Sequence, residues 1–181
     1  MKCNRRFNKI CAFRILIVLT FISTLLIMKK IEPTFLVYSK GKKMLDMQFG
    51  YNSIDVYQLF KTLKRKGRLI YIKSLYVDCI FTISYIFVQN YILKFAMGKT
   101  ILGTRWRILL STAYLRGLFD IMENIFILTL LYKYKIKLPI LVTMASCITI
   151  FKFIFLGIWV ISIPLVLIVR LMMKKNAVEK I

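Results

Sequence analysis

The sequence is poor in the residues that most catalytic and metal sites need. It has no histidine, seven acidic residues and four cysteines, which are Cys3, Cys11, Cys79 and Cys147. No pair of cysteines shows C-x-x-C spacing, and we expect all four to be free thiols. A zinc site containing histidine, a histidine general base and a cysteine–histidine couple are therefore excluded. Phosphate-loop, nucleophile-elbow and dinucleotide-binding motifs are also missing, so we expect no metal and no cofactor.

Glycine and proline are scarce too, with 7 and 3 residues, which leaves no room for a flexible linker. Apolar residues, by contrast, make up 59% of the 181 residues, and the mean hydropathy is +0.70. A soluble domain typically has ~45–50% apolar residues. Here they form long runs, which is typical of membrane-spanning helices. The fold class that we predict is all-α: a polytopic helical membrane protein with about four transmembrane helices and an amphipathic interfacial helix.

The apolar runs divide the chain into seven segments. They are a basic N-terminal segment (1–11), a first span (12–28), a connection (29–73) with an amphipathic helix at about 53–66, a second span (74–93), a third span (108–131), a fourth span (138–169) and a basic C-terminal tail (170–181). The first span resembles a signal peptide, but no small-x-small cleavage site follows it, so we expect it to be uncleaved. The fourth run exceeds the ~20 residues that a span requires, so tilt, a kink at Pro164 or projection past the bilayer must absorb the excess.

The amphipathic helix in the connection has two interpretations. Val56, Leu59, Phe60 and Leu63 fall at helical spacing along one face, and basic residues occupy the rest of the surface. Such a helix either lies on the membrane with its apolar face in the lipid boundary or docks on the transmembrane bundle. Both alternatives keep it at the interface.

The charge balance is strongly basic, with 29 Lys and Arg against seven Asp and Glu, a formal net charge of +22. The cations flank the apolar runs, where each attracts an anionic headgroup by roughly 1 kcal/mol. We therefore expect the protein to interact with a lipid bilayer that has anionic headgroups and not with nucleic acid. A membrane protein is a further possible partner. Arg5, Arg6 and Lys9 precede the first span, which favours cytoplasmic termini in a multi-pass cell-membrane protein.

Charge inside the predicted spans is the informative anomaly. Each ionised group at bilayer depth costs about 2.5–3.5 kcal/mol, so such groups face the bundle interior and pair. Arg116 and Asp120 are four residues apart on one helical face, which predicts an ion pair. Lys152 on the fourth span is expected to form an ion pair with Asp120 or Glu123. The candidate site is thus a polar cluster of Asp78, Arg116, Asp120, Glu123, Asn124 and Lys152.

Three carboxyls against two cations in this cluster predict that one carboxyl holds a proton, because like charges in a low dielectric oppose ionisation. A structural polar core, an ion, proton or small-solute site, and a catalytic acid–base pair all fit this pattern. Elsewhere, Tyr85, Gln89 and Asn90 are expected to hydrogen-bond between helices. Ala113 and Gly117 form a small-xxx-small pair that favours close packing within the bundle.

The stretch from Leu45 to about Lys152 resembles a group of small, uncharacterised bacterial membrane proteins with four predicted transmembrane helices. The matching residues are Leu45-Asp46, Phe49-Gly50-Tyr51, Val56-Tyr57, Gly67-Arg68, Tyr71, Asp78, Phe81, Tyr85, Leu118-Phe119-Asp120, Glu123-Asn124, Thr149 and Lys152. The group often has a proline where this chain has Thr82, so a kink shared with the group is not implied. The resemblance implies the span count and the polar residues, and it implies no activity.

The leading functional hypothesis is a non-enzymatic membrane protein, acting as an accessory, immunity-type or small transport component around a buried polar cluster. The alternative is an intramembrane lipid-modifying enzyme that uses Asp120 and Glu123 as acid and base beside Arg116.

Overall fold

The computed structural model describes the backbone of residues 2–102 and 105–178, and side chains for residues 11–98, 101 and 105–174. This part of the chain is almost entirely helical and contains no strand. The elements are α1 (Lys2–Ser39), η1 (Leu45–Met47), α2 (Ser53–Leu102), η2 (Arg105–Leu110), α3 (Ser111–Tyr132) and α4 (Pro139–Val178). Three helices contain stretches long and apolar enough to cross a membrane, within Cys11–Ser39, Ser53–Gly98 and Pro139–Lys174.

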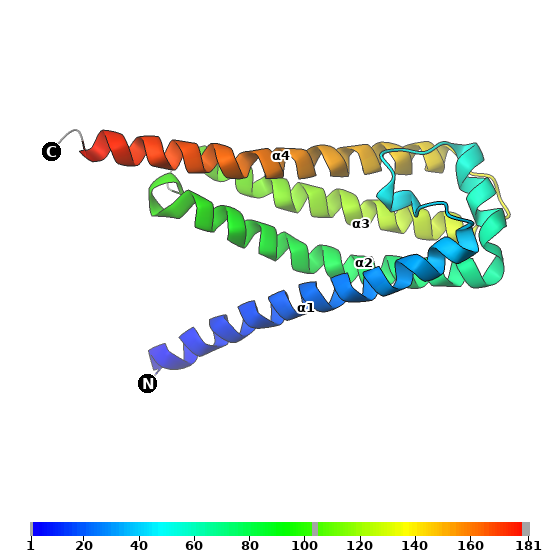
Figure 1. The fold of residues 1–181 in the computed structure, drawn as a ribbon, viewed down its shortest axis with the longest axis horizontal. Helices are drawn as coiled ribbons and strands as arrows, with labels where there is room; N and C mark the ends of the chain where they lie inside the picture. Colours follow the sequence, from blue (N-terminus) through cyan, green and yellow to red (C-terminus); the bar gives the residue numbers. More distant parts are fainter. Residues whose placement is uncertain (1, 103–104, 179–181) are drawn as a thin grey trace.

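The helices run along one long axis (Figure 1). The N-terminal end of α1, the last turns of α2 and the C-terminal end of α4 lie at one end of the molecule, which we call the terminal end. The connection between α1 and α2 and the loop between α3 and α4 lie at the opposite end, the connection end. Helix α1 meets α2 near the connection end and diverges from the other helices toward the terminal end (Figure 1).

Helix α1 is longer than the predicted first span and continues through Pro33 to Ser39. A proline inside a helix removes one backbone hydrogen bond. The helix nevertheless continues, and Phe35 is fully buried against Tyr71, with ring centroids 5.1 Å apart. The apolar run ends at Lys29, and the helix extends beyond it because Phe35 packs against Tyr71.

The predicted amphipathic helix is the first part of α2. It ends at a kink at Lys64, whose φ of 50° and ψ of −166° are not helical. This part lies across the connection end of the bundle (Figure 1). Val56, Leu59, Phe60 and Leu63 are at most 2% exposed, packed in one apolar core with residues of α1, α3 and α4. Of the two sequence-based alternatives, the helix thus adopts the docked one.

Helix α4 continues through Pro164 as one helix, so no break there absorbs its length. Its neighbour α3 is shorter, at 22 residues, and carries Arg116, Asp120 and Glu123, so it is not among the three helices apolar enough to span. Gly117 of α3 faces Ile86 of α2 so closely that a Cβ at this position would lie 2.2 Å from the Ile86 Cδ1. The small-residue pair therefore serves packing within the bundle, as the sequence predicts.

The molecule has an extensive apolar surface, and its interior contains buried polar side chains beside apolar clusters. Only 6% of the most apolar 18-residue stretch of α1 and 11% of that of α4 is buried. Buried polar side chains, in contrast, gather between α2, α3 and α4. Among the cysteines, Cys11 and Cys147 are exposed and Cys79 is half-buried, all three as free thiols, while the side chain of Cys3 lies outside the described residues.

Candidate functional site

Lys152 of α4 is the centre of the buried polar residues. Its Nζ lies 3.1 Å from Asp120 Oδ1 and 2.5 Å from Glu123 Oε2, both on α3. It also donates a hydrogen bond to the backbone carbonyl of Asp46 at 3.0 Å. An ammonium has three protons to donate, and three oxygens surround it here, two in ion pairs and one in a hydrogen bond. The sequence predicts that Lys152 pairs with Asp120 or Glu123, and in the structure it pairs with both.

Asp120 is shared between α4 and α2. While its Oδ1 faces Lys152, its Oδ2 accepts hydrogen bonds from the hydroxyls of Thr82 and Tyr85, each at 2.8 Å. The side chain is buried, with 4% of the residue exposed. Donors on α4 and α2 thus converge on this one carboxyl of α3. Asp120 therefore joins all three helices of the bundle interior.

Glu123 is fully buried one turn further along α3. Its Oε1 accepts a hydrogen bond from the hydroxyl of Thr149, which comes from the same face of α4 as Lys152. The hydroxyl oxygen of Tyr51 lies 3.4 Å from that of Thr149. Burial, with the nearby Glu123 charge, raises the pKa of Tyr51. This hydroxyl stays protonated beside the carboxylate.

Asp46 brings a fourth carboxyl to the cluster from the connection between α1 and α2, which folds back into the bundle as η1 (Figure 1). Its Oδ1 accepts a hydrogen bond from the hydroxyl of Tyr71 at 2.9 Å, and that hydroxyl accepts one from the backbone N–H of Leu45 at 2.8 Å. Burial raises the pKa of Asp46 above its ordinary value of 3.8, and the charge of Lys152 opposes the shift.

Asp78 and Asn124 form a second pair beside these residues. The Nδ2 of Asn124 donates a hydrogen bond to Asp78 Oδ2 at 2.7 Å, joining α3 to α2. Both residues are at least 94% buried. The predicted approach of Asp78 to the acidic face of α3 is thus present, through Asn124.

Arg116 is the one predicted cluster member whose expected ion pair is absent. Among the described residues, both ion pairs are made by Lys152, and the guanidinium of Arg116 instead lies over the ring of Tyr85, 4.1 Å from its centroid. Side chains on a helix lean toward its N-terminus, so an arginine that precedes its acidic partner by one turn leans away from it. Arg116 therefore reaches Asp120 only indirectly, through Tyr85.

Five residues of the cluster were missing from the sequence-predicted site: Asp46, Tyr71, Thr82, Tyr85 and Thr149. A signal for some of them exists in the sequence. Asp78, Thr82, Tyr85 and Gln89 fall at spacings of four, three and four residues, which makes a polar stripe along one face of α2. Asp46 lies outside this stripe and meets Lys152 across 106 residues of chain, so its only sequence signal is the resemblance to the bacterial membrane proteins, which also includes Tyr71, Tyr85 and Thr149.

The resulting centre, which we call the ionic cluster, holds four buried carboxyls (Asp46, Asp78, Asp120 and Glu123) and the ammonium of Lys152. The carboxyls are not gathered as metal ligands: no group of three or more acidic or cysteine side chains could hold a metal ion among the described residues. The arrangement instead favours protons and hydrogen bonds as the means of balancing charge.

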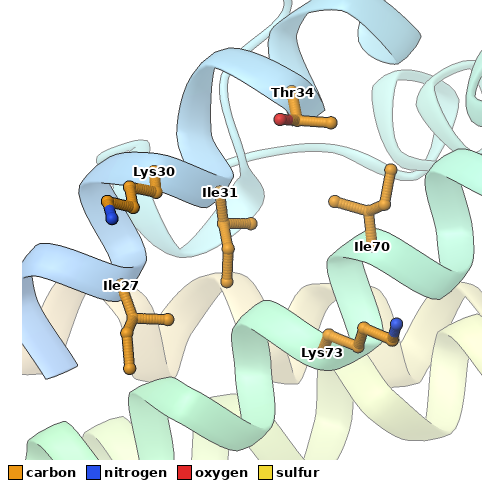
Figure 2. A pocket seen from close by; sticks show the side chains of 6 residues that line it. All are labelled: Ile27, Lys30, Ile31, Thr34, Ile70 and Lys73. Carbon is orange, nitrogen blue, oxygen red and sulfur yellow. The ribbon is translucent and has the colours of Figure 1, made fainter.

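Two hollows lie away from the ionic cluster, along the seam between α1 and α2. The smaller has a volume of about 240 Å³ and lies near the connection end. Figure 2 shows Ile31 and Ile70 facing across it, with Lys30 and Lys73 on opposite sides of it and not converging. The larger hollow, of about 580 Å³, lies toward the terminal end between Arg14, Val18 and Lys94.

Comparison with protein-family models, with curated proteins and with solved structures gives no match for this chain. The resemblance to small bacterial membrane proteins therefore stays a prediction from the sequence.

Proposed function

We propose that this chain is an integral membrane protein that crosses the bilayer with four helices and acts without enzymatic chemistry, as a small proton-handling transport component. The observation that carries the proposal is the ionic cluster, in which the buried ammonium of Lys152 faces two of four buried carboxyls, those of Asp120 and Glu123.

The distribution of apolar surface supports the membrane assignment. Exposed apolar side chains cover α1 and α4, a surface that water does not tolerate at this extent in a monomer. Charges bound the apolar stretch on two helices. Arg14 and Lys29 are 15 residues apart on α1, and Lys73 and Lys94 are 21 apart on α2. At 1.5 Å per residue these distances are about 22 Å and about 31 Å, against a hydrocarbon layer of ~30 Å.

Helix α3 crosses as the fourth span in this proposal because its charged face is turned inward. Asp120 and Glu123 are buried against Lys152, and Asn124 against Asp78. Ionised residues within membranes take such positions, and proton and ion pathways are among the functions that they serve.

The excess of carboxyls over cations in the ionic cluster is the reason for proposing that the protein handles protons. Four ionised carboxylates and one ammonium would leave three net negative charges in a dry interior, at several kcal/mol each. Carboxyls in excess of the ammonium hold protons instead, and a held proton beside an ionised neighbour is one that can be exchanged. The hydroxyl of Tyr71 contacts the Asp46 carboxyl near the connection end, and Lys152, which binds the Asp46 backbone carbonyl, faces Asp120 toward the middle of the bundle. These contacts place exchangeable protons at two levels of the bundle.

Proton flux tests the proposal. The purified protein would be reconstituted in liposomes that contain a pH-sensitive dye, and a potassium diffusion potential would drive protons inward. We expect flux above that of empty liposomes, and a loss of at least about tenfold for Asp120→Asn, by analogy with the loss of a positioned proton-transfer group. Asp55→Asn is the matched control, because Asp55 is exposed and lies outside the ionic cluster.

Wild-type flux equal to that of empty liposomes would overturn the transport role and leave an accessory or immunity-type protein. A purely structural cluster has another signature: Asp120→Asn would lower the melting temperature in detergent while flux stayed unchanged.

The enzymatic alternative has less support from the geometry. Asp120 and Glu123 are already engaged by Lys152 and are buried, whereas an acid–base pair must reach its substrate. A changed membrane lipid composition after deletion or overexpression of the protein would restore this alternative.

A further inference from the structure

The larger hollow between α1 and α2 has the chemical gradient of a lipid site. Arg14 and Lys94 lie nearer the terminal end of the two helices, and the apolar side chains of Val18 and Phe87 line the hollow further toward the middle of the bundle. Its volume of about 580 Å³ falls within the range of ordinary ligand sites, roughly 300–1,000 Å³. A cationic mouth above an apolar wall fits a molecule with an anionic head and an acyl tail.

The two cations are available for a ligand. No acidic residue lines the hollow, and no ion pair is made by Arg14 or Lys94 among the described residues. The guanidinium of Arg14 lies over the ring of Tyr91 at 5.3 Å from its centroid, and Tyr91 is three residues before Lys94 on α2. This stacking holds the guanidinium on the same side of α2 as the lysine.

Asn90 also lines the hollow, but its polar group belongs to the helix. It is 4% exposed, its Nδ2 donates to the backbone carbonyl of Ile86, and its Oδ1 is buried out of reach of a ligand. The cations and the apolar wall are therefore the parts of the hollow that a ligand would contact.

We propose that this hollow, the α1–α2 groove, binds one anionic glycerophospholipid, with its phosphate between Arg14 and Lys94 and an acyl chain along Val18 and Phe87. The inference rests on the membrane part of the proposed function and is independent of proton handling, since the groove shares no residue with the ionic cluster.

Native mass spectrometry of the full chain, released from a neutral detergent, tests the site with phosphatidylglycerol and phosphatidylcholine as probes. We expect one phosphatidylglycerol to be retained. Two juxtamembrane cations give about a thirtyfold preference over phosphatidylcholine, a preference that the variant R14Q/K94Q should lose.

The variant K30Q/K73Q is the matched control, because it removes the same charge at the smaller hollow, where the two lysines do not converge (Figure 2). It should retain phosphatidylglycerol. Val18→Trp supplies a second variant that leaves every charge in place and fills the groove, and it should reduce retention of the lipid. Equal retention by wild type and both double variants would overturn the proposal and indicate adsorption through the +22 net charge. Equal retention of phosphatidylcholine by the wild type would also overturn it.

The two proposals can fail independently. If the wild type shows no lipid preference, the groove proposal fails, and the flux measurements on the wild type and Asp120→Asn still test the ionic cluster. If the wild type shows no flux, the transport proposal fails, and lipid retention still tests the groove. Release of the protein from vesicles by alkaline carbonate would refute the membrane assignment beneath both.

Discussion

Removing the Lys152 ammonium is the most demanding test of the ionic cluster. Lys152→Met keeps the length and apolar stem of the side chain but removes the group that faces Asp120 Oδ1, Glu123 Oε2 and the carbonyl of Asp46. Two buried carboxyls then lose their counter-charge, and one buried carbonyl loses its donor. Breaking a buried ion pair from one side typically costs about 3–5 kcal/mol, and the hydrogen bonds from Thr82, Tyr85 and Thr149 offset only part of it.

We therefore expect Lys152→Met to lower the free energy of unfolding by about 3–5 kcal/mol, measured by titration with sodium dodecyl sulfate in mixed micelles. Lys174→Met is the matched control on the same helix: Lys174 is exposed, and such substitutions change stability by about 0.5 kcal/mol or less.

The triple variant D120N/E123Q/K152M separates charge from packing. Because it removes the acidic groups together with the ammonium, it should be more stable than Lys152→Met alone. A loss below about 1 kcal/mol for Lys152→Met, or a triple variant no more stable than it, would refute the assignment of Lys152 as the counter-charge.

Three further predictions concern other parts of the molecule. Gly117→Ala should destabilise the bundle by about 1–3 kcal/mol, because its Cβ would meet Ile86 Cδ1 at 2.2 Å, whereas Gly157→Ala should be neutral or stabilising, since no atom lies within 4 Å of its Cβ; thermal unfolding in detergent measures both. At the kink in α2, Lys64→Gly should be more stable than Lys64→Ala by about 1 kcal/mol, because φ is 50° there; equal stability would contradict the backbone conformation. Asp46 titrates at a raised pKa in the folded chain, so the folded state binds more protons than the unfolded state above pH 3.8, and stability should fall as pH rises from there through the folded-state pKa; Asp46→Asn should flatten this slope in unfolding measured between about pH 4 and pH 8.

The sequence predicts well what depends on local pattern. Apolar runs and helical spacing indicate the four helices, and the acidic face of α3 follows from Asp120, Glu123 and Asn124 within five residues. Lys152 is the only cation within the interior of the fourth run, so it is the natural partner for that face.

Features that depend on distant parts of the chain are less accessible. The extension of α1 depends on Phe35 packing against Tyr71, and the contact between Asp46 and Lys152 closes over 106 residues. The Arg116 prediction failed for a different reason: spacing alone brings two residues to one face, but the lean of helical side chains decides whether they meet.

The position of Lys152 in the chain has a consequence for biosynthesis. Ribosomal synthesis delivers the four carboxyls of the ionic cluster at positions 46, 78, 120 and 123, and the ammonium that pairs with two of them emerges only afterwards, on the last helix. A nascent chain that ends before α4 therefore contains Asp120 and Glu123 without their ion-pair partner, and the backbone carbonyl of Asp46 lacks its donor. The bundle can complete these contacts only after the last helix has been synthesised.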